Sequence, residues 1–290
     1  MKKNITNIPT LFSNILTLST LLTFLFLFII PAYADPSSRY FNHGISHLNK
    51  AQYEKAEEMF LKAINIYPCY AEAHYYLGMV YTYLDQYNKA SKHYEKACEL
   101  NPNYAFAYHS YGLLQNKLGN TEQAIQLLLK AISIYPGYSD ACYNLGAIYE
   151  NAGNDTEAMK MYRQTVSVES EFALAHYNLA EIYLKTGKDT EALAEYETAI
   201  KYDSEIAEAH YGLGIIYYRK NEFDNAIKEF NRTIELKPDS RESYFNLGVC
   251  YEFHKSDMEK ALFYYRKYVN LGGENKRVKE IVNRTSSSTK

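Results

Sequence analysis

Tryptophan is absent from this 290-residue chain, and proline, glycine and cysteine are scarce, with 7, 13 and 4 residues respectively. Such low proline and glycine contents exclude a collagen-like chain. A hydrophobic content of 47%, with 31 Tyr and 13 Phe, excludes an intrinsically disordered one. We therefore expect a folded protein with ample chain to bury a hydrophobic core.

The chain also lacks an excess of positive charge, since its formal net charge is -3 at pH 7. Its one dense basic stretch is Lys276, Arg277 and Lys279, near the C-terminus. Nucleic-acid binding requires clustered Lys and Arg side chains that displace counterions from phosphates. Three basic residues on one predicted helix are more typical of a solvated face, so we predict no nucleic-acid partner.

Motifs of known catalytic or cofactor chemistry are missing as well. The sequence contains no GxxxxGK[ST], no GxGxxG after a strand, no HExxH and no GxSxG. His43 and His47 are four residues apart on one predicted helix, but no third metal ligand accompanies them, which favours two packing positions. We predict a non-enzyme with no catalytic residue, no metal site and no cofactor.

The cysteines, too, lack a recognisable pattern. Cys69, Cys98, Cys142 and Cys250 show no CxxC spacing, and scattered single cysteines in helices commonly act as small apolar residues. Disulfide formation stays open, because the N-terminal sequence predicts export to an oxidising compartment.

The first 34 residues have the order of a secretory signal peptide. Lys2 and Lys3 precede an apolar stretch that is dense over residues 21–30, and the small-residue triplet at 32–34 favours cleavage before Asp35. The alternative is an uncleaved membrane anchor formed by residues 11–30. Both interpretations place the rest of the chain outside the cytoplasm, and richness in Lys, Asn and Ile favours a bacterial periplasm or cell envelope.

Small residues recur at intervals of 34 positions, and this period decides the fold prediction. One series consists of Gly44, Gly78, Gly112, Gly146, Ala180, Gly214 and Gly248. A second, in the same register, consists of Ala56, Ala90, Ala124, Ala158, Ala192 and Ala226, followed by Ala261 one residue late. A third consists of Pro68, Pro102, Pro136, Ser170, Ser204 and Pro238. Such phased series indicate tandem structural repeats.

The pattern within each repeat predicts two helices. The positions of a repeat are numbered as places 1 to 34, with Ala71 at place 1 of the second repeat. Places 4, 7, 8 and 11 form one face of a first helix, called helix A, and places 20, 24 and 27 form one face of a second, called helix B. Place 15 holds residues that tolerate a left-handed conformation, and Pro at place 32 ends helix B. The small residues at places 8 and 20 allow the two helices to pack closely.

These residues closely resemble the tetratricopeptide repeat, whose pattern of aromatic, Leu-Gly, Tyr, Ala, aromatic, Ala and Pro positions recurs here. The resemblance covers residues 37–270 and implies an all-α, right-handed superhelical solenoid of antiparallel helix pairs. We expect seven repeats followed by a capping helix and tail at 271–290. The expected repeats are 37–70, 71–104, 105–138, 139–172, 173–206, 207–240 and 241–270. The first repeat departs from the pattern at His43 and His47, and the seventh gains one residue between Phe253 and Lys260.

The resemblance further implies a concave groove, lined by helix A, that holds partner peptides or domains. Places 5, 9 and 12 lie on a different face from the buried stripe, and place 5 is largely aromatic. Lys117, Lys185 and Arg219 at place 13 are candidate contacts for acidic groups. The predicted groove residues are Phe41, Tyr75, His109, Leu113, Lys117, Tyr143, Tyr177, Glu181, Lys185, Tyr211, Arg219 and Phe245. Members that bind acidic chaperone tails carry Lys and Asn at places 5 and 9 of the first repeat. This chain has Phe41 and Ile45 there, so that function is not expected.

The expected function is therefore that of a non-catalytic scaffold or adaptor for other proteins, acting outside the cytoplasm. An alternative is a substrate-recruiting accessory subunit of a separate enzyme, because the repeats also resemble those that serve protein glycosyltransferases. Membrane contact is expected only through an uncleaved N-terminal segment, and self-association remains open. The sequence does not identify the partner.

Overall fold

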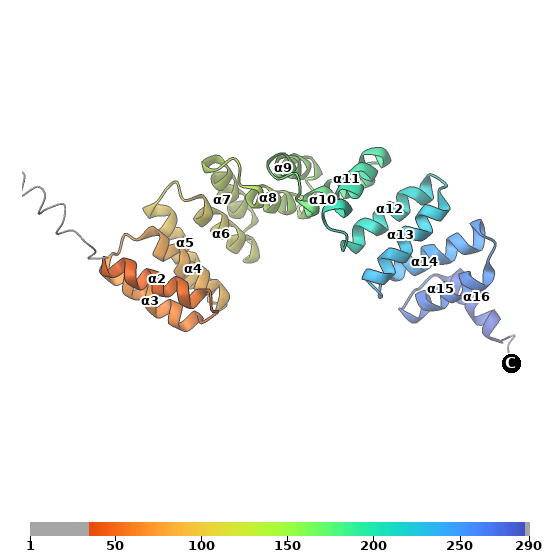
Figure 1. The fold of residues 1–290 in the computed structure, drawn as a ribbon, viewed down its shortest axis with the longest axis horizontal. Helices are drawn as coiled ribbons and strands as arrows, with labels where there is room; N and C mark the ends of the chain where they lie inside the picture. The colour runs from red at the N-terminus through yellow and green to blue at the C-terminus, as the bar shows by residue number, and fades with distance from the viewer. Residues whose placement is uncertain (1–34, 288–290) are drawn as a thin grey trace, which may run out of the picture. The chain divides into compact units, whose positions relative to one another are not determined.

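A computed structural model describes residues 35–287, and helices are the only regular secondary structure in this part of the chain (Figure 1). The segment predicted to be a signal peptide or anchor lies outside the described residues. None of the helices within 35–287 has the length and apolar character needed to cross a membrane. The helices are α2 (Pro36–Leu48), α3 (Tyr53–Ile66), α4 (Ala71–Tyr83), α5 (Tyr87–Leu100), α6 (Ala105–Lys117), α7 (Thr121–Ile134), α8 (Ser139–Asn151), α9 (Asp155–Val168), α10 (Ala173–Lys185), α11 (Asp189–Tyr202), α12 (Ala207–Arg219), α13 (Phe223–Leu236), α14 (Arg241–Val249), α15 (Met258–Asn270) and α16 (Lys276–Ser287).

The chain divides into two compact units, one ending at Leu114 and the other beginning at Gln115. In the first unit, α2 packs on α3, α3 on α4 and α4 on α5. In the second, successive helices from α7 onward pack on one another in the same way (Figure 1). Each unit is therefore a stack of helix pairs, in which α4, α8, α10 and α12 are helices A and α5, α9, α11 and α13 are their helices B.

Within a pair, the small residue at place 8 faces the side chain at place 24. A Cβ atom added to Gly146 would lie 2.7 Å from Cε1 of Tyr162, and one added to Gly78 would lie 2.8 Å from Cδ1 of Tyr94. The rings of Tyr162 and Tyr196 are fully buried. The recurring glycine is thus explained by the aromatic ring of helix B, which fills the space where a side chain of helix A would otherwise lie.

The turn between the two helices adopts the left-handed conformation predicted for place 15. Gly119, Gly153 and Gly187 have φ values of 84°, 76° and 74°, while Asp85 and Asn221, at the same place, have 55° and 63°. Glycine adopts this conformation without a steric penalty, and Asn and Asp tolerate it better than other residues do. This local prediction is confirmed.

The extra residue of the seventh repeat lies in a π-helical segment, η1 (Cys250–His254), which directly continues α14. The next left-handed residue is Ser256, with φ of 52°, one position later than the period would place it. A π turn accommodates one inserted residue without ending the helix. Helix α15 therefore still packs on α14, and its Tyr265 is fully buried opposite Gly248.

Histidines at place 4 connect neighbouring repeats by hydrogen bonds. The Nε2 atom of His176 lies 3.1 Å from the carbonyl oxygen of Ser170 in the preceding repeat, and its Nδ1 lies 2.6 Å from Glu195 of its own helix B. His210 repeats this arrangement with Ser204 and Glu229. The hydrogen bond with Glu195 raises the pKa of His176 above its ordinary value. The sequence places these histidines on the buried face of helix A, at place 4, but does not reveal the carboxylate partner.

In the second repeat the residue facing the place 4 histidine is another histidine. Nδ1 of His74 lies 3.0 Å from Nδ1 of His93, while Nε2 of His74 lies 3.1 Å from the carbonyl oxygen of Pro68. Burial, together with the neighbouring His74, lowers the pKa of His93 to about 4, and burial also lowers that of His74. With Nε2 of His74 donating to Pro68, a neutral pair requires His93 to donate to His74.

The first repeat has no preceding helix among the described residues. His43 is accordingly exposed, although place 7 is buried in the next repeat, where Leu77 occupies it. His47 is half-buried and forms a 2.7 Å hydrogen bond with Gln52. The interpretation of both histidines as packing residues is therefore wrong for His43, which no helix before α2 covers among the described residues.

Replacement of Gly146 by valine should destabilise the protein by about 1–3 kcal/mol, because the new side chain would overlap the buried Tyr162 ring. Gly146→Ala should cost less, since Ala180 occupies the same place opposite Tyr196. Thermal and urea unfolding followed by circular dichroism measure both effects. Ala152→Val, at an exposed helix end, serves as the control, and an equally small effect of Gly146→Val would contradict the packing role.

Acidification should destabilise the protein through His93. Because its folded-state pKa of about 4 lies below the ordinary value of 6.5, the unfolded state binds a proton first, and stability present above pH 6.5 is lost as the pH falls towards 4. Between pH 7 and pH 5, the free energy of unfolding of the His93→Gln variant should therefore fall by about 1–2 kcal/mol less than that of the unmodified protein. Urea unfolding at the two pH values tests this prediction, and equal losses in both proteins would refute it.

Candidate functional site

The predicted groove residues at place 5 pack partly against side chains of their own repeat. Three tyrosine rings of the second unit lie against the ring at place 24, with centroid distances of 5.7 Å for Tyr143–Tyr162, 6.2 Å for Tyr177–Tyr196 and 5.8 Å for Tyr211–Phe230. Phe41 similarly contacts Phe60, and Tyr75 contacts Tyr94. These side chains therefore contribute to the core as well as to a surface.

Their exposure differs between the two units. In the first unit Tyr75 and His109 are each 9% exposed, Phe41 is half-buried, and Leu113 is 36% exposed. In the second unit Tyr143, Tyr177, Tyr211 and Phe245 are all half-buried. The second unit thus presents more of its aromatic surface, and it is analysed below as the candidate site. The helix A face is defined as places 2, 5, 6, 9 and 12 of helices A in this unit.

The cations predicted at place 13 lie at the edge of this face and are exposed. Lys185 forms a 2.6 Å ion pair with Asp155, and Arg219 forms a 2.9 Å ion pair with Asp189, which begins helix B of the preceding repeat. Lys117 is also exposed. The geometry therefore joins Lys185 and Arg219 to carboxylates of this chain, a pairing that the sequence analysis did not foresee.

Asparagines at place 6 connect the helices A of adjacent repeats. The side-chain amide of Asn246 donates to the Tyr211 hydroxyl at 3.3 Å, and that of Asn178 donates to the Tyr143 hydroxyl at 3.5 Å. The carbonyl oxygen of each amide is a further hydrogen-bond acceptor. Sequence reasoning missed these residues, although the recurrence of Asn at place 6 in residues 144, 178 and 246 was a readable signal.

Two carboxylates of the helix A face accept hydrogen bonds from the buried tyrosines at place 24. Tyr162 donates to Glu150 at 2.6 Å, and Tyr196 donates to Glu181. Burial is the main cause that raises the pKa of Glu181, and the nearby negative charges of Glu150 and Glu208 raise it further. Glu181 was predicted as a groove residue, whereas Glu150, at place 12, was not named.

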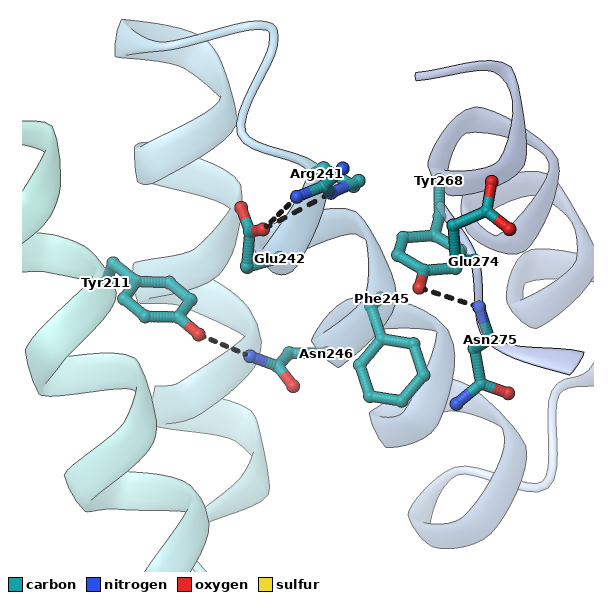
Figure 2. A pocket seen from close by; sticks show the side chains of 8 residues that line it. All are labelled: Tyr211, Arg241, Glu242, Phe245, Asn246, Tyr268, Glu274 and Asn275. Atoms are coloured by element: carbon teal, nitrogen blue, oxygen red, sulfur yellow. Dashed lines mark hydrogen bonds and ion pairs between the residues drawn. The ribbon is translucent and has the colours of Figure 1, made fainter. Parts of the chain in front are cut away.

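A cavity of about 530 Å³ lies at the C-terminal end of the helix A face (Figure 2). Phe245 lies at its centre, with Tyr211 of α12 on one side and Tyr268 of α15 on the other. The predicted residues Tyr211 and Phe245 thus share one site. Arg241, Glu242, Asn246, Glu274 and Asn275 complete the lining. The segment before α16 closes this end, because the backbone N–H of Asn275 donates to the Tyr268 hydroxyl at 3.1 Å.

The charges around the cavity are balanced by ion pairs. Arg241 contacts Glu242 at 3.1 Å, and Lys279 contacts Glu274 at 2.7 Å. The aromatic side chains offer apolar contact area, while the side-chain amides of Asn246 and Asn275 offer hydrogen-bonding groups. This combination suits an uncharged or apolar side chain whose backbone hydrogen-bonds to the amides.

The described residues offer no comparable arrangement for metal or thiol chemistry. Residues 35–287 contain no group of three or more His, Cys, Asp or Glu side chains placed to hold a metal ion. All four cysteines are free thiols, and three of them are buried. Burial raises the pKa of Cys98 to about 12 and those of Cys142 and Cys250 to about 11, which suppresses their reactivity.

Family models described as tetratricopeptide repeat match residues 37–68, 71–104, 93–126 and 115–169, and a further model matches 143–200, 177–241 and 217–275. The chain belongs to the tetratricopeptide repeat family. Members of this family are scaffolds for protein–protein interaction and are typically non-catalytic. No curated protein matches the chain in sequence.

Solved structures share the fold. The C-terminal part of a TPR repeat-containing protein from Cytophaga hutchinsonii has a TM-score of 0.68 at 17% identity, covering 83% of this chain and 99% of that one. The structure of Pseudomonas aeruginosa pilF has a TM-score of 0.65 at 20% identity, and the match covers 77% of this chain and 98% of that one. YrrB, described as a TPR protein with an unusual peptide-binding site, has a TM-score of 0.56 at 22% identity. That match covers 67% of this chain and 97% of YrrB. The all-α solenoid of tetratricopeptide repeats is thus shared with these proteins.

Removal of a place 13 cation should affect stability little. Lys185 is 65% exposed, and ion pairs of exposed side chains contribute about 0–1 kcal/mol. Lys185→Ala should therefore lower the free energy of unfolding by less than about 1 kcal/mol. Urea unfolding provides the measurement. A loss as large as that expected for Gly146→Val would show that the Lys185–Asp155 pair is structurally essential.

Proposed function

We propose that this chain is an extracytoplasmic scaffold whose helix A face in residues 115–290 binds an extended peptide segment of a partner protein. The observation that carries the proposal is the cavity of about 530 Å³ around Phe245, where aromatic rings and amide groups lie together at the closed end of that face. Apolar contact area and backbone-compatible hydrogen bonds are the two components that peptide recognition requires.

Two further features support the same proposal. Half-buried Tyr143, Tyr177 and Tyr211 continue the aromatic surface along three successive helices A, and their rings are already held by packing. Preformed rings lose little conformational entropy when a partner binds. YrrB, with the same fold, is described as having a peptide-binding site. The signal-like order of residues 1–34 supports the proposed location outside the cytoplasm.

A bulky residue in the cavity should weaken partner binding without unfolding the protein. Asn246→Tyr places a ring at place 6, where the second repeat naturally has Tyr76, and it also removes the amide that contacts Tyr211. In an envelope extract, the tagged mature chain should be cross-linked to partners, and the variant should recover them about tenfold less, which corresponds to ~1.4 kcal/mol. Quantitative mass spectrometry provides the readout.

The matched control is Asn225→Tyr, the same substitution at an exposed position of α13. It should leave partner recovery unchanged, and both variants should show unmodified circular dichroism spectra. Equal recovery with both variants would show that the helix A face is not the binding surface. A recovered glycosyltransferase, lost with Asn246→Tyr, would support the alternative of an accessory subunit.

A further inference from the structure

The helix A face carries a concentration of negative charge around Tyr177. Glu150 of α8, Glu181 of α10 and Glu208 of α12 all act electrostatically on the Tyr177 hydroxyl, whose pKa is raised mainly by burial and additionally by these charges. Glu150 and Glu208 act on Glu181 in the same direction. Packing places the same groups together, because the Tyr177 ring lies 6.2 Å from that of Tyr196, whose hydroxyl donates to Glu181. Asn178, next to Tyr177 in α10, donates to Tyr143, whose ring lies 5.7 Å from that of Tyr162, the donor to Glu150. Carboxylates of α8 and α10 therefore lie near one half-buried ring.

Only part of this charge is neutralised within the chain. Lys237 forms a 2.8 Å ion pair with Glu208. Glu150 and Glu181, by contrast, accept hydrogen bonds from tyrosine hydroxyls and have no ion pair among residues 35–285. A hydroxyl donor satisfies an acceptor atom but carries no compensating charge.

Two basic side chains of the neighbouring helices A are ion-paired with other carboxylates. Arg219 exerts a weak electrostatic effect on Tyr196, but its guanidinium is ion-paired with Asp189. Lys185 is ion-paired with Asp155. The excess negative charge beside Tyr177 is therefore a property of the folded face.

A ligand cation would be attracted both by the carboxylates and by the aromatic ring. A Lys or Arg side chain between two partly buried carboxylates gains Coulomb energy that is screened less than at an exposed surface. The electron-rich face of an aromatic ring adds a further attraction when a cation lies over it. The Phe245 cavity has balanced charges and so offers no comparable preference.

We propose that Glu150, Tyr177 and Glu181 form a subsite that receives a lysine or arginine side chain of the bound peptide segment. This inference rests on the proposed function, since it assigns a charge preference to one part of the same face. The occupant is a basic segment of a partner protein, and charge complementarity selects it over a neutral or acidic one.

The test uses a random-peptide display library, selected on the mature chain at low salt. We expect the selected peptides to be enriched in Lys and Arg. In fluorescence polarisation with the best of these peptides, Glu150→Gln combined with Glu181→Gln should weaken binding about tenfold or more, and rising salt should weaken binding to the unmodified chain. Glutamine keeps an acceptor for the Tyr162 and Tyr196 hydroxyls, so the fold should be retained.

Glu191→Gln combined with Glu197→Gln is the matched control. Both residues are exposed on α11, and Glu197 also accepts a tyrosine hydrogen bond, from Tyr217 at 3.4 Å. This variant removes the same amount of charge away from Tyr177 and should bind like the unmodified chain. Equal weakening by both double variants would overturn the subsite, because net charge alone would then explain the preference.

The remaining outcomes separate the subsite from the proposed function. Peptides without basic enrichment whose binding is lost in Asn246→Tyr would overturn the charge preference and leave peptide binding by the helix A face intact. A library that yields no binding peptide, or peptides insensitive to Asn246→Tyr and to the Glu150/Glu181 variant alike, would overturn both.

Discussion

The contact between a small residue at place 8 of helix A and an aromatic ring at place 24 of helix B is the constraint on which the structure depends. A Cβ atom at Gly146 would approach the Tyr162 ring to 2.7 Å, closer than nonbonded carbon atoms lie in proteins. The glycine therefore sets how near the two helices approach. Because each pair leaves apolar surface uncovered, the same spacing repeats wherever another pair is added to the stack.

This packing also determines part of the chemistry of the surface. When the ring at place 24 is a tyrosine, its hydroxyl is buried and needs an acceptor. Glu150, Glu181 and Glu252 supply that acceptor for Tyr162, Tyr196 and Tyr265. In the seventh repeat Arg277 neutralises Glu252, whereas no cation among residues 35–285 pairs with Glu150 or Glu181. A structural requirement of the core thus places negative charge beside the aromatic side chains of the helix A face.

The repeat fold was predictable because its determinants are local and recur with one period. The turn at place 15 depends on the backbone conformation of a single residue, and all six of its occupants from Ala51 to Asn221 adopt positive φ. The surface was less predictable. Place 5 was identified as aromatic, but the contribution of Tyr75 to packing depends on rings such as Tyr94 and Tyr104 that only the folded helices bring within 6.0 Å and 5.1 Å. Asn246 and Glu150 were missed because a single row of places does not show which side chains meet across neighbouring helices.

The sequence by itself determined the helix pairs, their turns and the family, since these follow from residue spacing along one helix or between two adjacent ones. Tertiary structure alone decided which charges stay unpaired. Lys185 is bound by Asp155 of the preceding repeat, Lys237 is bound by Glu208 from a distance of 29 positions, and neither pairing follows from helical periodicity. The physical reason is that an ion pair depends on the distance between side chains of different helices, and the packing of those helices sets that distance.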